Sequence, residues 1–150
     1  QQFKKIKKEN KMEKYIHKVN YYETDKMGVT HHSNYVRWME EARVYFLESI
    51  GFPYDKLEDD GIISPVIGIN CEYKESTTFN DDIEIEVSVK EFKGVRLVIE
   101  YIMKNKDTQK LVLKGVSEHC FLNKSGKLVR LSKEFPEFDN KLKELAQKSV

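Results

Sequence analysis

The chain has 150 residues, which is enough for one domain whose hydrophobic core needs no disulfide or metal ion to stabilise it. Its 26 basic residues nearly balance its 25 acidic residues, and a net charge of +1 creates no overall field that favours nucleic acid or an anionic membrane. We therefore expect no nucleic-acid partner. No stretch approaches the roughly 18 apolar residues of a membrane span, so we also expect no membrane insertion.

Cysteine usage and the first residues of the chain bear on its compartment. Cys71 and Cys120 lie in strand-like runs, outside any Cys-x-x-Cys or Cys/His spacing, so we expect reduced thiols and no metal site. Residues 1–14 are rich in lysine and lack the apolar run of a signal peptide. The sequence therefore predicts a flexible basic leader and a cytoplasmic protein.

In chain order, the first elements are a strand and a long helix. We expect the strand over Tyr15–Tyr22 and the helix over about Ser33–Ile50, ended by Gly51 and Pro53. Apolar residues at helical spacing form one wide stripe, which is the pattern of a helix packed inside a sheet: Tyr35, Trp38, Met39, Ala42, Tyr45, Phe46 and Ile50. On the flank of this stripe, Glu40 and Arg43 are predicted to form a partly buried ion pair.

The rest of the chain reads mainly as strands. After a helical turn over Tyr54–Asp60, alternating apolar and polar residues predict four strands: Ile63–Lys74, Asp82–Phe92, Val95–Asn105 and Gln109–Leu122. Short polar connections at Lys93-Gly94 and Asn105–Thr108 indicate hairpins in an antiparallel sheet, and the order of the four runs predicts a meander. A brief strand over Leu128–Leu131 and, from Asp139, a surface helix or tail with Leu142, Leu145, Ala146 and Ser149 at helical spacing complete an α+β architecture.

The segment before the long helix carries the chemistry. Asp25 lies in a turn closed by Gly28, and Ser33 or Asn34 offers a side-chain oxygen to cap the helix. The unpaired N–H groups at a helix start carry the positive end of its dipole, so they suit a carbonyl oxygen that becomes an anion. A carboxylate that faces such donors predicts an acyl-transfer site for a thioester or ester.

The motif in this segment is specific enough to indicate a family. Asp25-x-x-Gly28-Val29, His32 and Asn34-Tyr35, followed by Glu40-x-Ala42-Arg43, resemble the signature of the 4-hydroxybenzoyl-CoA thioesterase family. The likeness extends over about Lys18 to Phe135 and is nearest to the small bacterial acyl-CoA thioester hydrolases. It implies a hotdog fold over 15–136, in which a sheet of about five strands wraps round one central helix, with a C-terminal helix or tail over 137–150.

The resemblance also implies a mechanism. Asp25 would attack the thioester carbonyl of an acyl-CoA or activate water to do so, and His32 would orient water or Asp25. N–H groups at Gly28, His32 and Ser33 would hold the oxyanion. Coenzyme A would enter only as part of the substrate, with no cofactor and no metal. A turn-stabilising role for Asp25, and a capping or packing role for His32, are the alternatives.

Substrate contacts are expected at two places. Val29, Tyr35, Trp38 and Met39 would line the acyl pocket, although such a stripe more commonly forms core. Lys93, Gly94 and Arg96 would meet the phosphates of coenzyme A, with a solvated turn as the alternative. By resemblance, two protomers would pair their sheets edge to edge in a homodimer or homotetramer, and the coenzyme A arm would enter between subunits.

Two other functions stay open on the same scaffold. An acyl-carrier-protein thioesterase would require a positive patch for an acidic carrier, and a binding module would hold acyl-CoA without hydrolysing it. A hotdog dehydratase is disfavoured because the paired prolines of its histidine loop are absent: Pro53, Pro65 and Pro136 are scattered.

Overall fold

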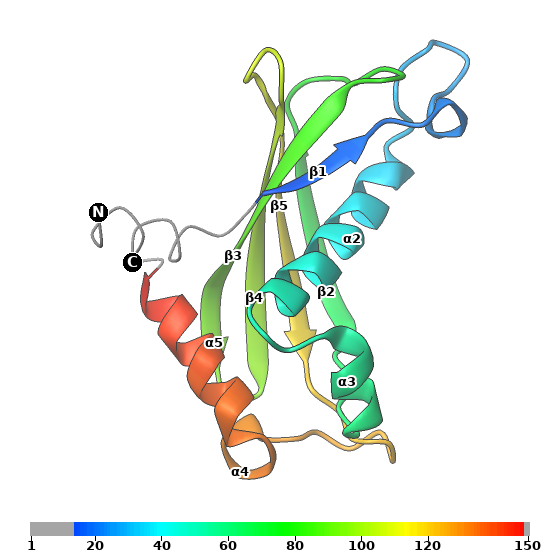
Figure 1. Cartoon of the computed structure of the whole chain (residues 1–150). Coiled ribbons are helices and arrows are strands. Elements are labelled where there is room, and N and C mark those ends of the chain that lie inside the picture. Colours follow the sequence, from blue (N-terminus) through cyan, green and yellow to red (C-terminus); the bar gives the residue numbers. More distant parts are fainter. Residues whose placement is uncertain (1–13, 149–150) are drawn as a thin grey trace.

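The computed structural model describes residues 14–148, and its centre is an antiparallel sheet with strand order β1-β3-β4-β5-β2 (Figure 1). The strands are β1 (Tyr15–Lys18), β2 (Val66–Tyr73), β3 (Asp82–Lys93), β4 (Arg96–Asn105) and β5 (Leu111–Cys120). β3, β4 and β5 form a meander, but the expectation of a four-stranded meander is wrong for β2, which pairs with β5 rather than with β3. β1 and β2 therefore occupy the two edges.

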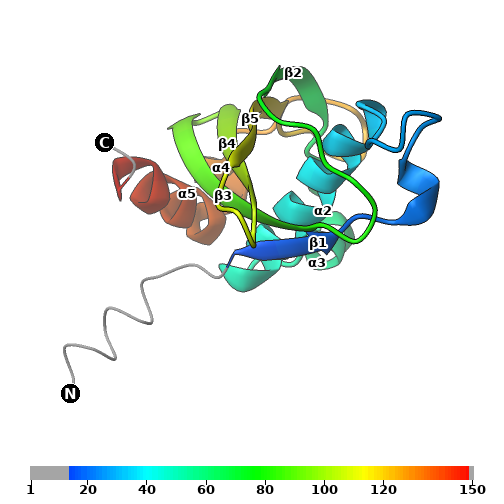
Figure 2. The ribbon, with the colours of Figure 1, turned by 90° about the horizontal axis from the view of Figure 1, so that it is seen from above.

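Helices cover one face of this sheet. They are η1 (Tyr21–Glu23), α2 (Ser33–Ser49), α3 (Tyr54–Asp59), α4 (Leu131–Glu134) and α5 (Pro136–Lys148). Seen from above, the sheet curves round α2, and α5 lies farther along, against β3 (Figure 2). This confirms the expected α+β hotdog architecture.

The apolar stripe predicted for the long helix fixes its orientation in the fold. Tyr35, Trp38, Met39, Ala42, Phe46 and Leu47 are all buried, and they face the inner side chains of the sheet. In β3, Ile83, Ile85, Val87 and Val89 are buried in alternation with more exposed polar residues. The apolar face of the helix, which repeats every 3.6 residues, therefore packs against the apolar face of the strand, which repeats every two residues, in one hydrophobic core.

Several predicted boundaries move. β1 ends at Lys18 rather than Tyr22, because Asn20 and Glu23 fold the chain into η1. β2 begins only at Val66, after Pro65, whose missing N–H interrupts strand pairing, and Ile63 keeps a single bridge to Leu122. The predicted strand over Leu128–Leu131 is reduced to one bridge between Leu122 and Leu128.

The last helix is more than a surface element. It starts at Pro136, a residue favoured at the first helical position, and its Phe138 and Leu142 are buried in the core. The predicted helix is therefore present, and one of its faces packs into the core. Ser149 and the predicted basic leader, apart from Lys14, lie outside the described residues.

The predicted ion pair between Glu40 and Arg43 is also wrong. Glu40 is exposed, and among residues 14–148 no contact within ion-pair distance joins the two. Arg43 instead donates a hydrogen bond of 3.4 Å to the hydroxyl of Tyr101 on β4. The helix directs Arg43 toward the sheet, where a buried hydroxyl is available, while Glu40 stays in solvent.

Three further observations concern the expectations from composition. Cys71 and Cys120 are free thiols, each half-buried. Within the part of the chain that the structure describes, no helix is long and apolar enough to cross a membrane. The same residues contain no group of three or more His, Cys, Asp or Glu side chains arranged to hold a metal ion.

Candidate active site

Asp25 stands at the tip of a tight turn that its own backbone and side chain close. Its N–H donates to the carbonyl of Val29 and its carbonyl accepts from Gly28 N–H, at 2.8 and 2.9 Å. Asp25 Oδ1 accepts the N–H of Met27 at 2.8 Å, and Gly28 has the positive φ of 80° that the turn requires. Oδ2 has no protein partner in the described chain, so one exposed carboxylate oxygen is left for chemistry.

The turn is attached to the fold on both sides. Thr24 and Thr30 form an antiparallel bridge beneath it, and Val29 forms another with Thr78 from the segment between β2 and β3. Thr30 N–H donates to the carbonyl of Thr77 at 2.8 Å, and the two threonine hydroxyls are hydrogen-bonded. Asp25 is therefore exposed at the tip of a loop whose base is buried and rigid.

The start of α2 differs from the predicted cap. Its N-cap is His32, which has helical backbone angles and makes no side-chain capping bond. Ser33 and Asn34 lie inside the first turn, so neither acts as the cap. The ring Nδ1 of His31 replaces that acceptor: it lies 3.3 Å from Ser33 N–H and 2.8 Å from Ser33 Oγ.

The predicted oxyanion donors are used to different extents. Gly28 N–H is occupied by the carbonyl of Asp25, and Ser33 N–H makes the long bond to His31. The N–H of His32 has no acceptor within residues 14–148. His32 itself is exposed, and its ring stacks on that of His31 with 4.3 Å between ring centroids. The arrangement thus offers one free N–H at the positive end of α2.

Three residues predicted to line an acyl pocket are core residues in this structure. Trp38 and Met39 are almost completely buried, and the hydroxyl of the buried Tyr35 lies 3.0 Å from Thr77 Oγ1. The Tyr35 ring packs on Trp38 and on Tyr73 of β2, with centroid distances of 4.8 and 5.6 Å. Of the four residues predicted to line the pocket, only Val29, which lies in the Asp25 turn and is half-buried, keeps solvent-exposed surface.

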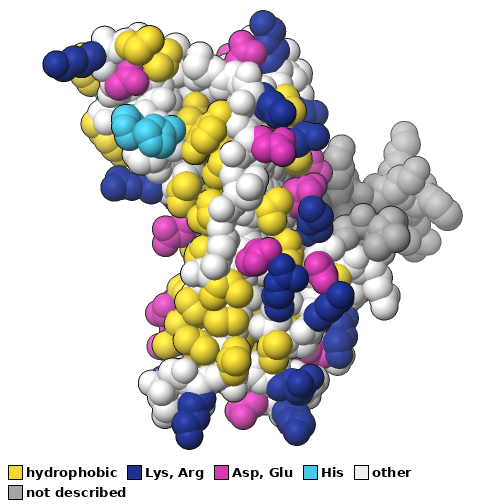
Figure 3. Space-filling model, turned by 180° about the vertical axis from the view of Figure 1, so that it is seen from behind, with side chains coloured by type: hydrophobic (Ala, Val, Ile, Leu, Met, Phe, Trp, Pro, Cys, Tyr) yellow, Lys and Arg dark blue, Asp and Glu magenta, His cyan; other side chains and the backbone are white. Residues whose placement is uncertain are grey.

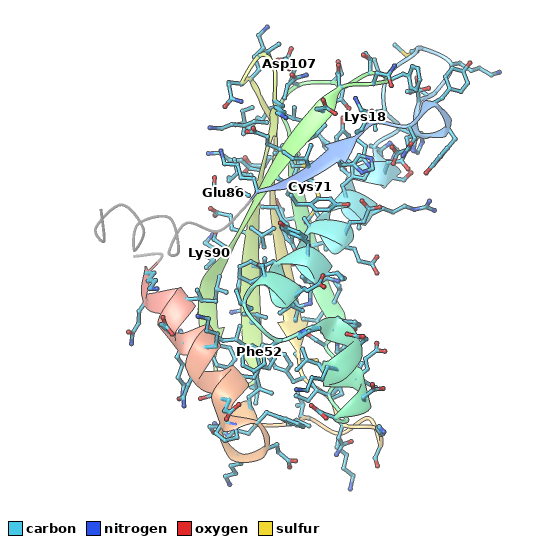
Figure 4. The ribbon with its side chains drawn as sticks, viewed as in Figure 1. Lys18, Phe52, Cys71, Glu86, Lys90 and Asp107 are labelled. Carbon is cyan, nitrogen blue, oxygen red and sulfur yellow. The ribbon has the colours of Figure 1, made fainter. Side chains whose placement is uncertain are left out.

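The predicted phosphate-binding residues lie far from Asp25 in the same chain. β3 pairs Asp82 with Lys18 next to the Asp25 loop and ends at Lys93, roughly 35 Å along the strand. Figure 4 shows this separation, with Lys18 near one end of the sheet and Lys90 toward the other.

Both cations of that hairpin already have carboxylate partners. Lys93 Nζ lies 2.9 Å from Glu91, and Arg96 lies 2.6 Å from Glu118 and 3.7 Å from Glu91. The hydrogen bond from Lys93, with its charge, lowers the pKa of the Glu91 carboxyl. Gly94 turns the hairpin with a φ of 65°.

Sequence reasoning missed a buried polar network behind the Asp25 turn. His17 of β1 lies 2.8 Å from Glu23 Oε1 and 3.2 Å from Glu41 Oε2, and Trp38 Nε1 donates to Glu23 Oε2 at 2.6 Å. Burial alone would raise the pKa of Glu23, but hydrogen bonds from Asn20 N–H, Trp38 and His17 together lower it. The sequence feature that could have indicated this network is an apolar strand that is interrupted by a histidine and followed closely by a glutamate.

The same network includes the hydroxyl of Tyr15, which donates to Glu41 Oε2 at 3.0 Å. Burial, together with the hydrogen bond and charge of Glu41, raises the pKa of Tyr15 to about 12. On a helical wheel Glu41 belongs to the outer strip of α2, and its side chain remains about half exposed, yet Tyr15 and His17 of β1 reach its carboxylate. The missing information was the position of β1, which no local pattern provides.

A second missed network crosses the sheet. Arg43 donates to Tyr101, whose hydroxyl lies 2.7 Å from Ser117 Oγ, and Ser117 Oγ lies 2.7 Å from His119 Nε2. Burial, and then the charge of Arg43, lowers the pKa of His119 to about 4. His119 is therefore neutral at pH 7, with Ser117 Oγ as the hydrogen-bond partner of its Nε2. The alternation of Ser117 and His119 on one face of β5 was the available signal.

A cavity of about 410 Å³ lies away from Asp25. Its lining comes from the loop after α2, from α3 and from α4 and α5, and includes Phe52, Leu57, Phe135 and Phe138. Figure 4 places Phe52 near the end of the sheet opposite Lys18. The cavity therefore contributes no residue to the site at Asp25.

Comparison with known proteins now adds to this geometry. The family model described as thioesterase-like superfamily matches residues 19–145. A Bacillus subtilis (strain 168) protein provisionally named acyl-CoA thioesterase YneP is 33% identical over 121 residues, covering 80% of this chain and 87% of that protein.

Two solved structures are similar in fold and sequence. DHNA-CoA thioesterase from Staphylococcus aureus has a TM-score of 0.85 at 31% identity, with 90% of this chain and 91% of that chain covered. A hypothetical protein from Aquifex aeolicus has a TM-score of 0.76 at 38% identity, with 83% and 96% covered. These findings confirm the predicted family, fold and class of enzyme. The chain belongs to the thioesterase-like superfamily of hotdog-fold thioester hydrolases.

Proposed function

We propose that this protein hydrolyses acyl-CoA thioesters, with Asp25 as nucleophile or general base. The observation that carries the proposal is the exposed carboxylate of Asp25, which keeps Oδ2 free on a rigidly held turn close in sequence to the free N–H of His32. Relatives named as acyl-CoA thioesterases and a structural neighbour that acts on an acyl-CoA support the same substrate class.

The chemistry needs few groups. A thiolate leaves with a pKa near ~8.5, by analogy with cysteine, so its departure needs little general-acid help. Asp25 would attack the carbonyl carbon directly or remove a proton from an attacking water. The negative charge that then forms on the carbonyl oxygen would be stabilised by His32 N–H and the dipole of α2, and such a donor is typically worth ~3 kcal/mol.

The test is thiol release from acetyl-, hexanoyl-, palmitoyl- and benzoyl-CoA by the wild type and by Asp25→Asn. Asparagine keeps an oxygen for Met27 N–H, so the turn is preserved while the charge is lost. We expect kcat to fall by ~10² to 10⁴. The control is Asp55→Asn, which alters an exposed aspartate whose Oδ1 also accepts a nearby N–H. Hydrolysis by Asp25→Asn at the wild-type rate would contradict the role.

Three outcomes separate the other functions. If the protein hydrolyses carrier-bound acyl groups faster than the matching CoA esters, the substrate is an acyl carrier protein. If it binds acyl-CoA tightly without releasing thiol at any chain length, it is a binding module. If hydrolysis of the CoA esters is the faster reaction and depends on Asp25, the proposal stands.

We further propose that two copies pair through β2. This edge strand has a free side, and its inner face, which carries Cys71 against Met39, leaves Ile69 and Tyr73 about half exposed beside α2. Figure 3, seen from behind relative to Figure 1, shows hydrophobic side chains that are open to solvent on this face of the molecule. An apolar edge strand of this kind usually has a partner.

Pairing would also account for the distant hairpin. A two-fold axis through paired β2 edges makes the strands antiparallel, so the Lys93–Arg96 hairpin of the second copy would lie at the same end as Asp25. That arrangement supports a coenzyme A arm that runs between subunits.

Light scattering on Ile69→Lys tests the interface against Ile16→Lys, because both residues are 41% exposed on edge strands. We expect a monomer only for Ile69→Lys. An unchanged mass for both variants would contradict the pairing.

A further inference from the structure

Arg43 of α2 is a partly buried cation without a carboxylate partner. Its guanidinium donates to the hydroxyl of Tyr101 at 3.4 Å, and none of the ion pairs within residues 14–148 includes it. A guanidinium that is partly removed from water normally pairs with an anion, because its desolvation is costly. Most of its five N–H donors are therefore available to an anion that the chain itself does not supply.

The groups around this guanidinium are polar but uncharged. The Tyr101 hydroxyl bonds Ser117, and Ser117 bonds His119, so the three form a buried chain beneath Arg43. Burial raises the pKa of Tyr101, which keeps its hydroxyl protonated, and burial followed by the charge of Arg43 lowers the pKa of His119 to about 4. An anion at this place would meet one cation and neutral hydrogen-bonding groups.

Arg43 lies on the flank of α2 that faces β2. Tyr35, Met39 and Arg43 follow one another at intervals of four residues, so they form one row along the helix. The Tyr35 ring packs on Tyr73 of β2, and Met39 Sδ lies 3.7 Å from Cys71 Sγ of the same strand. The row therefore runs along β2 from the first turn of α2 to Arg43 (Figure 1).

The inner side of β2 is apolar and open to solvent. Three of its residues pair in register with buried residues of β5 and so point to the inner face of the sheet, yet they are 41 to 52% exposed. We call these residues the β2 strip: Val66, Ile69 and Tyr73. Pairing of two β2 edges would use backbone groups and leave this inner face beside α2. The strip thus offers a surface on which an apolar chain can bind.

The ends of the β2 strip correspond to the ends of an acyl chain. At one end, the hydroxyl of Tyr35 bonds Thr77, which also bonds the base of the Asp25 loop. The helix rises roughly 16 Å from His32 to Arg43, and the Arg43 side chain leans back toward the helix start. An extended chain gains ~1.3 Å per bond, so about eight to twelve carbons would join the two places.

We propose that the acyl group cleaved by this protein ends in a carboxylate, and that Arg43 is the specificity-determining residue that binds it. The inference rests on the proposed function of Asp25. The thioester end would lie at Asp25, the apolar middle on the β2 strip, and the far carboxylate on the guanidinium in a two-hydrogen-bond pair. A chain that ends in a methyl group would leave Arg43 without a counter-charge and cover it with apolar surface, which is unfavourable.

The kinetic test compares octanoyl-CoA with octanedioyl-CoA, which has the same eight carbons but a carboxylate at the far end. The ten- and twelve-carbon pairs extend the comparison. For at least one pair we expect the wild type to have a kcat/KM ~10-fold or more higher for the dicarboxylic ester. Arg43→Met keeps an apolar stem without the charge, so this preference should disappear. The control is Arg37→Met, which removes an exposed cation of the same helix and should leave the preference unchanged.

The ratio of the two esters separates recognition from a structural role. If Arg43 only supports the fold, Arg43→Met should lower both rates by the same factor. Tyr101→Phe removes the hydroxyl that Arg43 bonds but keeps the cation, so it should retain the preference for the dicarboxylic ester. Equal losses for both esters in Arg43→Met, or a wild type that prefers the methyl-ended ester of every pair, would overturn the proposal.

Isothermal titration calorimetry with the same ester pairs gives a readout that does not need turnover. In the Asp25→Asn variant, the dicarboxylic ester should bind ~10-fold or more tightly than its partner, and Asp25→Asn with Arg43→Met should bind both alike. If the wild type hydrolyses neither ester but this Arg43-dependent difference is present, the proposed function fails while the inference stands. If both esters are hydrolysed through Asp25 and Arg43→Met leaves their ratio unchanged, the inference fails while the proposed function stands.

Discussion

The hydroxyl of Tyr35 lies 3.0 Å from Thr77 Oγ1, although the two residues are 42 positions apart in the sequence. This contact joins the first turn of α2 to the segment between β2 and β3, and Thr77 also bonds Thr30 at the base of the Asp25 loop. One buried threonine therefore connects the helix, the loop and the sheet.

Replacing Thr77 by valine should lower the free energy of unfolding by about 1 to 3 kcal/mol. Valine has the same shape, but it leaves the buried hydroxyl of Tyr35 without its partner. Urea denaturation measures the change. Thr78→Val, at the exposed neighbouring position, should stay within about 0.5 kcal/mol of the wild type. Equal stability of Thr77→Val and the wild type would show that the hydroxyl contact contributes nothing.

Gly28→Ala should affect both stability and activity. No atom lies within 4 Å of the added Cβ, so the free energy of unfolding should fall only because alanine is strained in the left-handed backbone conformation, by roughly 1 to 2 kcal/mol. Gly126→Ala is a matched control, because Gly126 has a φ of 78° and equally open surroundings in a remote turn. Both variants should lose similar stability in urea, but only Gly28→Ala should lower kcat. A similar loss of kcat in both variants would show that the Asp25 turn has no specific role in the reaction.

Gly115→Ala should overpack the core between β5 and α2. An added Cβ would lie 3.0 Å from Met39 Cε and 3.1 Å from Leu113 Cδ2. The expected loss is about 1 to 3 kcal/mol by urea denaturation. Gly68→Ala meets only the flexible side chain of Glu118, at 3.4 Å, and should cost clearly less. The reverse order of the two variants would mean that Met39 repacks without strain.

The buried His119 should make the protein sensitive to acid. Its pKa is about 4 in the folded state against an ordinary value of 6.5, so the unfolded chain binds the proton first as the pH falls. The neutral His119 therefore contributes its full share of the free energy of unfolding above pH 6.5. That contribution is lost as the pH falls toward 4, at ~1.4 kcal/mol per pH unit.

Urea denaturation at pH 6.5 and at pH 4.5 measures this loss. His119→Gln keeps a hydrogen-bonding side chain beside Ser117 without titrating, so its stability should fall less steeply between the two pH values. Parallel losses in the wild type and the variant would assign the acid sensitivity to other groups.

The local pattern of the sequence determined the elements and much of the loop. The apolar stripe of α2 and the alternation in β3 require one buried face each, and Asp25 followed by Gly28 specifies a tight turn whatever surrounds it. Those features depend on residues close together in the chain, so period and turn chemistry suffice to predict them.

Only the tertiary structure decided which partners the polar side chains find. Glu41 belongs to the outer strip of its helix but accepts a hydrogen bond from Tyr15 of β1, and Arg43 bonds Tyr101 rather than the glutamate three residues before it. His17 meets Glu23 and Glu41 because the sheet curls over α2. A polar group on the flank of a helix takes the partner that packing brings to it, and that partner comes from a distant part of the chain.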